Sequence, residues 1–388
     1  MTQAAPTRTN LCASTTIVER IDNLFDYLGA DGFAWASENI SIVTSGVAAV
    51  VEANNVQETL SCISGEGAIA CGSLPFTATA SASLVIPARV VRQSATQTTI
   101  TTIEGANVGL PHRYAHTPLR FTVEALQDLA AWDAIVASAL ASIDDGSVDK
   151  IVLAREVLVT ADHDFNVPEV LTTLQRTQPG CFVYANGGFV GASPELLVRR
   201  SGRNVVSMPM AGTVARQASI EADDATIATL RASMKDNAEH RYVVEAVAGA
   251  LAAHCENIEI SDAVPVLLAT VTHLTTKISA ALVDHSTALD LALALHPTPA
   301  VGGTPTAAAL QAIEKLEPFD RRCYGGPVGW VDKTGDGEFA VALRCAELRG
   351  TTARLIAGVG IVDGSDPDLE WAETQAKLEP MLRALVRP

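Results

Sequence analysis

The spacing of apolar residues predicts a helix and several strands in the middle of the chain. Residues 130–143 repeat apolar side chains at helical spacing, and residues 150–159, which follow closely, are rich in Val and Ile. We therefore expect a helix that leads into a strand. Residues 181–185 and 189–192 flank Asn186-Gly187-Gly188, which is typical of a tight turn between antiparallel strands.

The C-terminal half shows longer patterns of the same two kinds. Residues 220–254 predict one or two long helices, and residues 326–331, 338–348 and 354–362 predict three strands of a meander. The last helix is expected from Ser365-Asp366-Pro367, where a capping residue precedes Pro, to about Val386. Hairpins mixed with long helices, without alternating βαβ units, indicate an α+β fold.

The chain carries no repeat, low-complexity tract or linker signal, so we expect one large domain over residues 17–388. Its first third contains short apolar pieces such as 84–91 and 99–103, without a chemical signature. Residues 1–16 are rich in Ala, Ser and Thr and lack an apolar signal core. We interpret them as a flexible tail, with a transit peptide as the second interpretation.

Composition and charge narrow the class of protein. Hydrophobic residues make up 48% of the 388 residues, but no apolar run reaches the roughly 18 residues needed to span a bilayer. A formal net charge of -17 argues against nucleic acid as a partner, because such binding needs clustered Lys and Arg. The seven cysteines are scattered and form no C-x-x-C pair, which favours a soluble protein in the reducing cytoplasm.

Two motifs imitate binding sites. Asp332-x-Thr334-x-Asp336-Gly337 matches the first half of a calcium loop, but Leu343 stands where a bidentate Glu is required, so a hairpin turn is expected. Gly358-x-Gly360-x-x-x-Gly364 has the wrong spacing for a dinucleotide fingerprint, and no βαβ unit follows it.

Two predicted helices each present a pair of carboxylates three residues apart. The pairs are Asp236 with Glu239 and Glu370 with Glu373, and residues at this spacing share a helix face. Carboxylate oxygens are ligands that Mg²⁺ prefers. The alternative is that Glu370 and Glu373 merely suit the start of a helix, with Glu373 pairing with Lys377 one turn later.

A series of motifs gives this pattern its context. They are Gly191-Ala192-Ser193-Pro194-Glu195-Leu196, Ala211-Gly212-Thr213, Asp236-x-x-Glu239-His240, His273-Leu274, His296-Pro297-Thr298-Pro299-Ala300, Glu317-Pro318-Phe319-Asp320-Arg321, Arg344-Cys345-Ala346, Ala357-Gly358-Val359-Gly360-Ile361-Val362 and Glu370-Trp371-x-Glu373-Thr374-x-x-Lys377-Leu378. In this order and spacing, from about Leu119 onward, the chain resembles the chorismate-utilising enzymes. The resemblance implies a single α+β domain of antiparallel sheets flanked by helices, with the site in a cleft.

The resemblance also implies a Mg²⁺ cofactor and a doubly anionic substrate, chorismate. Glu239 and Glu373 correspond to the principal Mg²⁺ ligands, with Asp236 and Glu370 in support, and the ion would bridge to the ring carboxylate. Lys377 would add charge at that carboxylate. A local cationic site of this kind is needed to hold an anion inside an acidic protein.

Further positions correspond to substrate-binding residues of the family. Arg344 matches the partner of the enolpyruvyl carboxylate. In the predicted strand 338–348 it shares a face with small residues, which leave room above the sheet; an arginine on a solvated strand face is the alternative. The other expected contacts come from the backbone of three glycines, a positioning histidine and three further residues: Gly212, Gly358, Gly360, His273, Thr213, Ala300 and Tyr324.

Lys150 and Glu195 match the family's general base and general acid. In isochorismate formation, water attacks ring carbon two while the hydroxyl at carbon four leaves, and such a reaction needs a base and an acid. Lys150 together with Ala211 implies water rather than ammonia as the nucleophile, because the ammonia-using relatives lack a lysine at the first position or carry an additional one at the second. A surface lysine and a capping glutamate are the ordinary alternatives for these two residues.

The resemblance therefore implies an isochorismate synthase, an isomerase that acts without a glutamine amidotransferase subunit and is typically a monomer. Ala300 stands where relatives that eliminate pyruvate or add an amine carry Thr, which favours release of isochorismate. Gly302 and Thr304 depart from the family pattern, so a salicylate synthase is the second hypothesis. A catalytically silent chorismate-binding subunit is the third. Menaquinone and siderophore biosynthesis both stay open as destinations of the product.

Overall fold

The computed structural model describes residues 11–77, 82–108 and 120–386, and only the backbone of Lys235 and Asp236. Residues 1–10 of the expected tail lie outside this description. Residues 13–16 were expected in the tail, and this is wrong, because they belong to strand β1 (Ala13–Val18), which pairs with β6 (Thr98–Ile103) from Ala13 to Val18. Most of β1 is exposed, so its polar composition resembles that of a tail.

Most strands form one 19-stranded sheet, which bends into two arms that meet at β5 (Ser83–Ser94). The first arm continues from β5 through a series of antiparallel pairs. Its strands are β3 (Ile40–Glu52), β2 (Phe33–Ala36), β9 (Phe182–Asn186), β10 (Phe189–Ser193), β21 (Cys345–Arg349), β22 (Thr352–Ile361), β8 (Lys150–Ala161) and β7 (Phe121–Ala125).

The second arm leaves β5 through the pair Cys71–Val85 and is also antiparallel. Its strands are β4 (Ile69–Ser73), β19 (Pro327–Asp332), β20 (Gly337–Val341), β11 (Leu196–Ser201), β12 (Asn204–Met208), β17 (Ile278–Leu282) and β14 (Cys255–Ile260). The short strand β18 (Gly303–Thr304) pairs with the start of β8. The predicted hairpin at Asn186-Gly187-Gly188 is confirmed as the β9–β10 turn.

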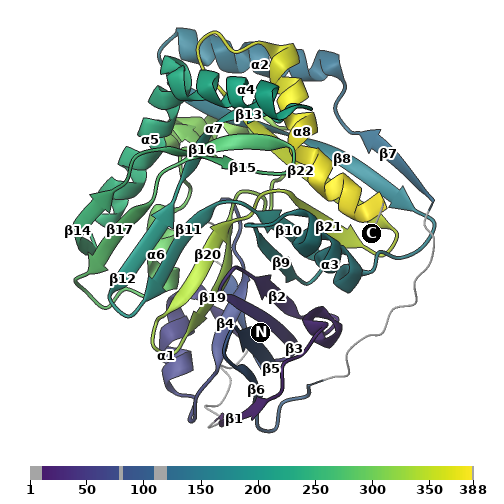
Figure 1. Ribbon diagram of the computed structural model, residues 1–388, viewed down its shortest axis with the longest axis vertical. Coiled ribbons are helices and arrows are strands. Elements are labelled where there is room, and N and C mark those ends of the chain that lie inside the picture. The colour runs from purple at the N-terminus through teal and green to yellow at the C-terminus, as the bar shows by residue number, and fades with distance from the viewer. Residues whose placement is uncertain (1–10, 78–81, 109–119, 387–388) are drawn as a thin grey trace, which may run out of the picture.

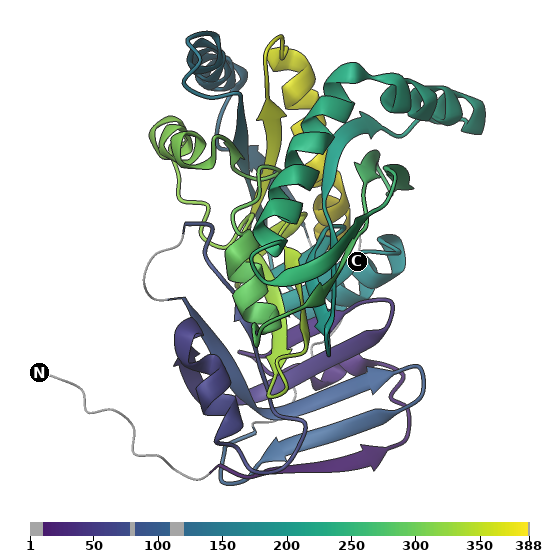
Figure 2. The same ribbon diagram turned by 90° about the vertical axis from the view of Figure 1, so that its left-hand side faces the viewer.

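The two arms pack face to face, and helices cover their outer faces (Figures 1 and 2). Aromatic residues of both arms, among them Trp35, Tyr184 and Trp330, form the core between them. A second core lies under α3 (Val167–Thr177) and α8 (Pro367–Val386), and a third lies under α2 (Leu129–Asp144), α6 (Ala288–Leu295) and α7 (Thr306–Leu316). Mixed helices and antiparallel sheets confirm the α+β fold. Three short helices in the first third are η1 (Leu24–Tyr27), η2 (Ala53–Asn55) and α1 (Val56–Ser61).

A small second sheet sits beside α4 and α5 near the top of Figure 1. It consists of β13 (Met210–Ala215), β16 (Val271–Thr275) and β15 (Val264–Leu267). The predicted helical region 220–254 forms two helices, α4 (Ile220–Ala232) and α5 (Met234–Leu251), because Ser233 between them is extended. The α5 helix packs on β13 and so faces the same space as the C-terminal helix α8.

The C-terminal helix begins where the sequence predicts. The carboxylate of Asp366 accepts hydrogen bonds from the backbone N–H groups of Asp368 and Leu369, which satisfies two donors of the first turn. Pro367 is the first helical residue, where its missing N–H is harmless. These local signals fix the phase of α8, and with it the face that carries Glu370 and Glu373.

The expected strand 338–348 is wrong as a single element. It divides into β20 and β21, which pair with different neighbours, and Ala342–Arg344 forms a break between them. Arg344 adopts a φ of 51°, a left-handed conformation that ends the alternation of faces. Arg344 therefore does not share a strand face with Ala340, Ala342 and Ala346.

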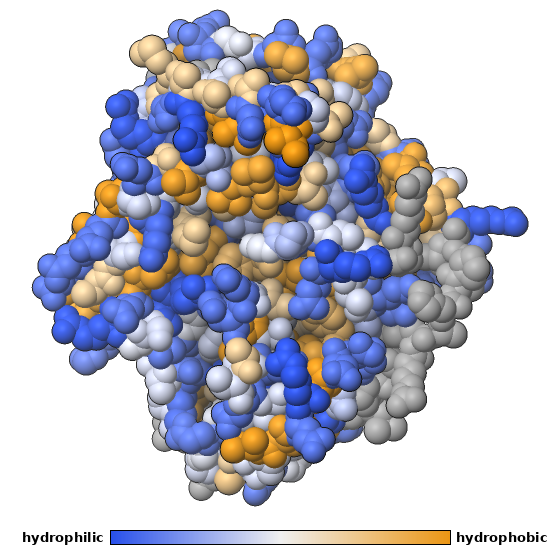
Figure 3. Space-filling view, in the orientation of Figure 1, coloured by the Kyte–Doolittle hydropathy of each residue, from blue (hydrophilic) through white to orange (hydrophobic). Residues whose placement is uncertain are grey.

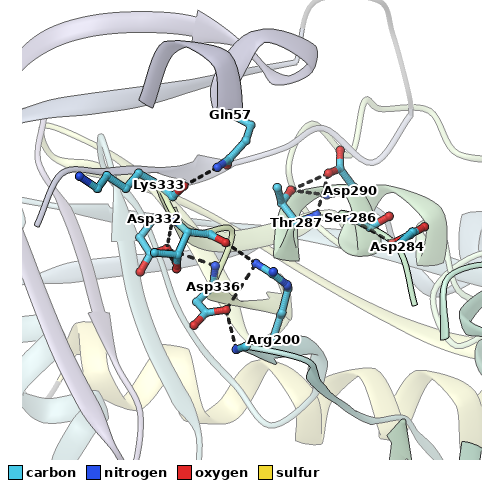
Figure 4. Close-up of polar contacts among 11 residues, drawn as sticks. Gln57, Arg200, Asp284, Ser286, Thr287, Asp290, Asp332, Lys333 and Asp336 are labelled. Atoms are coloured by element: carbon cyan, nitrogen blue, oxygen red, sulfur yellow. Dashed lines mark hydrogen bonds and ion pairs between the residues drawn. The ribbon is translucent and has the colours of Figure 1, made fainter. Parts of the chain in front are cut away.

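The motif that imitates a calcium loop is confirmed as the turn between β19 and β20. Its oxygen atoms bind groups of the protein itself (Figure 4). The carboxylate of Asp332 accepts hydrogen bonds from Thr334 and from the N–H of Asp336, and Arg200 donates to the carbonyl of Thr334 at 2.7 Å. Gln57 of α1 donates to the carbonyl of Lys333 at 2.6 Å.

The surface fits the charged composition. Figure 3 shows a face dominated by hydrophilic side chains, with apolar patches that are separated from one another. Within the described ranges, no helix is long and apolar enough to cross a membrane.

Candidate active site

One cavity of about 340 Å³ lies between α5, α8, the small sheet and the strands β8 and β22. This volume is in the range of small-molecule sites. All of the predicted site residues whose side chains are described line it, namely Lys150, Glu195, Gly212, Thr213, Glu239, His273, Ala300, Tyr324, Arg344, Gly358, Gly360, Glu370, Glu373 and Lys377. Asp236 lies in α5, but its side chain is outside the described part of the structure.

Lys150 and Glu239 meet across the cavity from different elements. Lys150 is the first residue of β8 and is only 4% exposed, and its Nζ donates to Glu239 Oε1 at 2.6 Å. Gly360 of β22 leaves room for this contact, because a Cβ there would lie 2.8 Å from Lys150 Cε and 3.2 Å from Glu239 Oε1. A side chain at this position would displace the ends of both side chains.

Lys377 and Glu373 form a second pair, one turn apart on α8. Lys377 Nζ lies 2.7 Å from Glu373 Oε1 and also donates to the carbonyl of Gly358 at 2.9 Å. The ion pair that the sequence offered as an alternative role for Glu373 is thus present, and it lines the same cavity. Glu370, one turn before Glu373, is buried in the cavity wall.

The residues on this wall fit a hard divalent cation in their chemistry. Glu239, Glu370 and Glu373 offer only oxygen donors, which suit Mg²⁺. Glu239 and Glu373 already hold cations, namely the ammonium groups of Lys150 and Lys377. Among the side chains that the structure describes, which exclude Asp236, no group of three or more His, Cys, Asp or Glu is drawn together as a metal site.

Glu195 faces the cavity from the loop between β10 and β11. It is 3% exposed, and burial raises the pKa of its carboxyl to about 7, although the nearby Lys150 and the N–H of Met210 act in the opposite direction. Desolvation disfavours the charged carboxylate. Glu195 can therefore hold a proton near neutral pH, as a general acid must.

Arg344 enters the cavity from the break between β20 and β21. Its guanidinium is buried, and this desolvation lowers the pKa of Arg344 from its usual value. The left-handed backbone costs roughly 1 kcal/mol for a residue with a Cβ. A strained backbone at a buried cation is a typical feature of binding sites.

His273 connects Arg344 to the small sheet. Arg344 Nη2 donates to His273 Nε2 at 2.9 Å, so Nδ1 carries the hydrogen and faces the hydroxyl of Thr213 at 3.0 Å and the carbonyl of Gly212 at 3.3 Å. Burial, followed by the charges of Arg344 and Lys377, lowers the pKa of His273 well below its usual value. The imidazole is neutral and orients the guanidinium. Gly212 has a φ of 72°, which few other residues adopt.

Tyr324 and Ala300 complete the cavity wall. Gly358 leaves room for the tyrosine, because a Cβ at Gly358 would lie 2.9 Å from the Tyr324 hydroxyl oxygen.

No role was predicted from the sequence for Glu317 and Arg321, although both lie in a motif. Arg321 pairs with Glu317 at 2.5 Å and donates to the carbonyls of Val301 and Val152, and Glu317 accepts from the N–H of Ala154.

This buried pair therefore ties β8, which carries Lys150, to the segment that follows Ala300. Removing one partner of such a pair leaves a buried charge uncompensated, so the pair is a structural support of the site. Its signal in the sequence was the i, i+4 spacing of opposite charges in a predominantly apolar chain.

The fold brings Lys150, Glu195, Arg344 and the carboxylates of α5 and α8 to one small-molecule site. The sequence model of the chorismate binding enzymes matches residues 76–386. The isochorismate synthase DhbC of Bacillus subtilis is 44% identical over 264 residues, which cover 64% of this chain and 66% of that protein. EntC of Escherichia coli, also an isochorismate synthase, is 40% identical over 67% of this chain and 68% of its own.

The solved structure of MenF, the menaquinone-specific isochorismate synthase of Escherichia coli, superposes with a TM-score of 0.87 at 25% identity and covers 99% of this chain and 96% of its own. The chain belongs to the chorismate binding enzyme family. The family match begins at residue 76, well before residue 119, where the motif resemblance starts. Part of the first third, in which sequence motifs are absent, thus also belongs to the family pattern.

Proposed function

We propose that this protein is a Mg²⁺-dependent isochorismate synthase, an isomerase that moves the hydroxyl of chorismate from ring carbon four to ring carbon two. The observation that carries the proposal is the shared cavity of Lys150, buried Glu195 and Arg344. Relatives named isochorismate synthases, at 40% and 44% identity, support it.

The chemistry divides between Glu195 and Lys150. Glu195 supplies a proton to the hydroxyl that leaves carbon four, and its pKa of about 7 keeps that proton available near neutral pH. Lys150 removes a proton from the water that attacks carbon two. Because Lys150 is paired with Glu239 in the structure, the base role requires that its ammonium group first lose a proton, so that the amine lone pair can accept one from water.

The substrate's two carboxylates need separate cationic partners. Arg344 binds the carboxylate of the enolpyruvyl group, held in place by neutral His273. Lys377 reaches the cavity from α8, where it donates to the carbonyl of Gly358 in β22, and binds the ring carboxylate. Two cations carried by different elements orient the ring, so that only one face meets Lys150.

Glu239 and Glu373, with Asp236 and Glu370 in support, would hold the Mg²⁺. The bound ion supplies positive charge that neutralises these carboxylates and attracts the ring carboxylate of the substrate. With Lys377, this provides an anion site within a protein of net charge -17. All four residues belong to α5 and α8, so a bound ion would be held by residues of both helices.

We further propose that the enzyme releases isochorismate and uses water alone. Ala300 in the cavity wall offers no hydroxyl to guide the enolpyruvyl group toward elimination, and Ala211 leaves the position beside Gly212 without a lysine. The protein accordingly needs no glutamine amidotransferase subunit.

Chromatographic analysis of the products tests this function. Purified protein with chorismate and Mg²⁺ should form isochorismate reversibly, with little pyruvate in a coupled lactate dehydrogenase assay and no aminated product when ammonium is added. Stoichiometric pyruvate with salicylate fluorescence would assign the chain to the salicylate synthases. Binding of chorismate without any product would assign it to silent binding subunits.

A further inference from the structure

The break between β20 and β21 lies between two residues of the proposed chemistry. Arg344 ends the break, and Glu195 contacts its start, since the N–H of Val341 donates to the carbonyl of Glu195 at 3.2 Å. The N–H of Gly325 donates to the carbonyl of Ala342 at 2.8 Å, and the N–H of Ala192 donates to the carbonyl of Arg344 at 3.2 Å. Two buried hydroxyl groups add contacts that ordinary strand pairing does not provide.

The first hydroxyl belongs to Tyr184 of β9. The side chain is fully buried and does not line the cavity, and its hydroxyl donates to the carbonyl of Leu343 at 3.2 Å. Leu343 directly precedes Arg344. The hydrogen bond therefore fixes the peptide plane at which the chain turns into the left-handed conformation of Arg344.

Gly191 gives this tyrosine its place. In the sheet, Gly191 lies opposite Tyr184 on one side and opposite Cys345 on the other. A Cβ on Gly191 would lie 2.4 Å from the Tyr184 hydroxyl oxygen and 2.9 Å from the Cβ of Cys345. The tyrosine thus reaches the break by crossing a strand where a side chain is absent.

The second hydroxyl belongs to Ser193, which is completely buried. It donates to the carbonyl of Val341 at 2.5 Å and accepts from the N–H of Glu195 at 3.2 Å. A single oxygen thus connects the end of β20 to the backbone of the general acid. Ser193, like Tyr184, does not line the cavity.

We propose that Tyr184 and Ser193 are positioning residues for the reaction, Tyr184 holding Arg344 toward the substrate carboxylate and Ser193 holding Glu195 toward the leaving hydroxyl. This inference rests on the proposed function. The two roles separate in kinetics. Loss of the Tyr184 hydroxyl lets Leu343 and Arg344 relax toward extended backbone and weakens binding, whereas loss of the Ser193 hydroxyl displaces the acid and slows the chemical step.

The test compares Tyr184→Phe and Ser193→Ala with two controls that remove hydroxyls elsewhere, Tyr27→Phe and Ser207→Ala. Tyr184→Phe should raise KM roughly 3- to 10-fold with kcat nearly unchanged. Ser193→Ala should lower kcat by a similar factor and move the basic limb of the pH profile, with KM nearly unchanged. Gly191→Ala, which displaces the tyrosine, should reproduce the KM effect of Tyr184→Phe. Both controls should match the wild type.

Hydrogen exchange of the amides of residues 342–345 and direct binding of chorismate complete the test, because neither needs turnover. Faster exchange and weaker binding in Tyr184→Phe support the proposal even if the wild type formed a product other than isochorismate, which would overturn the proposed function alone. Equal changes of kcat and KM in both variants, or wild-type values in both, would overturn the positioning roles, since the hydroxyls would then serve stability alone.

Discussion

The charged groups of the cavity fall into two sets, which we call the paired side and the unpaired side. The two sets differ in whether their members form ion pairs. On the paired side, Lys150 binds Glu239 at 2.6 Å and Lys377 binds Glu373 at 2.7 Å. On the unpaired side, within the described ranges, neither Glu195 nor Arg344 forms an ion pair. Burial raises the pKa of Glu195 to about 7, although the N–H of Met210 and the charge of Lys150 oppose this shift, and burial lowers the pKa of Arg344 from its usual value.

Paired and unpaired charged groups suit different tasks. Paired carboxylates can exchange one cation for another, which suits a metal site. Glu195 and Arg344 leave their charged or polar ends facing the cavity, and burial shifts the pKa of Glu195 toward the value that acid catalysis near neutral pH needs. Ion pairing and burial thus place glutamates, which are the same residue type, in two different electrostatic environments.

The largest effect is expected on the paired side. Glu239→Gln and Glu373→Gln each remove a charged ligand of the proposed Mg²⁺ and should abolish isochorismate formation, because a neutral amide binds the ion weakly. Product should be followed by chromatography over a Mg²⁺ titration in EDTA-treated buffer. Glu379→Gln, on the same helix but outside the cavity, is the matched control. Wild-type turnover in both variants would refute the metal assignment.

The second largest effect is expected for one residue of each side. Lys150→Ala and Glu195→Gln should each lower kcat by about 10²- to 10⁴-fold, the usual contribution of a positioned base or acid. Chorismate binding, measured by calorimetry, should persist, since Arg344, Lys377 and the proposed ion remain. A near-normal kcat in either variant would remove that residue from the mechanism.

The raised pKa of Glu195, on the unpaired side, predicts how the free energy of unfolding depends on pH. The folded protein holds the proton of Glu195 up to about pH 7, whereas an unfolded glutamate loses it near pH 4.3. The stability that this proton contributes is therefore complete below about pH 4.3 and is lost as the pH rises through 7.

Glu195→Gln has no such proton. Its free energy of unfolding relative to the wild type should increase by about 2 kcal/mol between pH 5 and pH 8. Urea denaturation at both values measures this gap. A constant gap would show that Glu195 ionises in the folded protein as it does in water. Wild-type kcat should fall above pH 7 for the same reason.

The smallest effect concerns the product. Ala300→Thr adds a hydroxyl and a methyl group to the cavity wall and should produce a small pyruvate release, measurable by the lactate dehydrogenase assay, while isochorismate remains the main product. Ala307→Thr, at an exposed position of α7, serves as the control. Identical pyruvate release in both variants would show that position 300 has no part in product choice.

Local patterns in the sequence predicted most of the elements. The cap and proline of α8, the Asn-Gly-Gly turn of the β9–β10 hairpin and the apolar period of α2 each depend on neighbouring residues, so the chain reveals them directly. Motif spacing also predicted the set of residues that line the cavity. The break at Ala342–Arg344 was missed, because its alternation of Ala and Arg is that of an ordinary strand.

What the sequence by itself determined is thus the α+β composition of elements, the family and the identity of the cavity residues. Only the tertiary structure decided their electrostatic state. Glu239 reaches Lys150 across 89 positions, and Tyr184 reaches Leu343 across 159. Glu195 and Glu239 are the same residue type, and the sequence cannot distinguish a desolvated carboxyl from a paired one. That difference comes from which strands and helices pack around each side chain, because water removed by packing and charges brought within hydrogen-bond distance set the pKa.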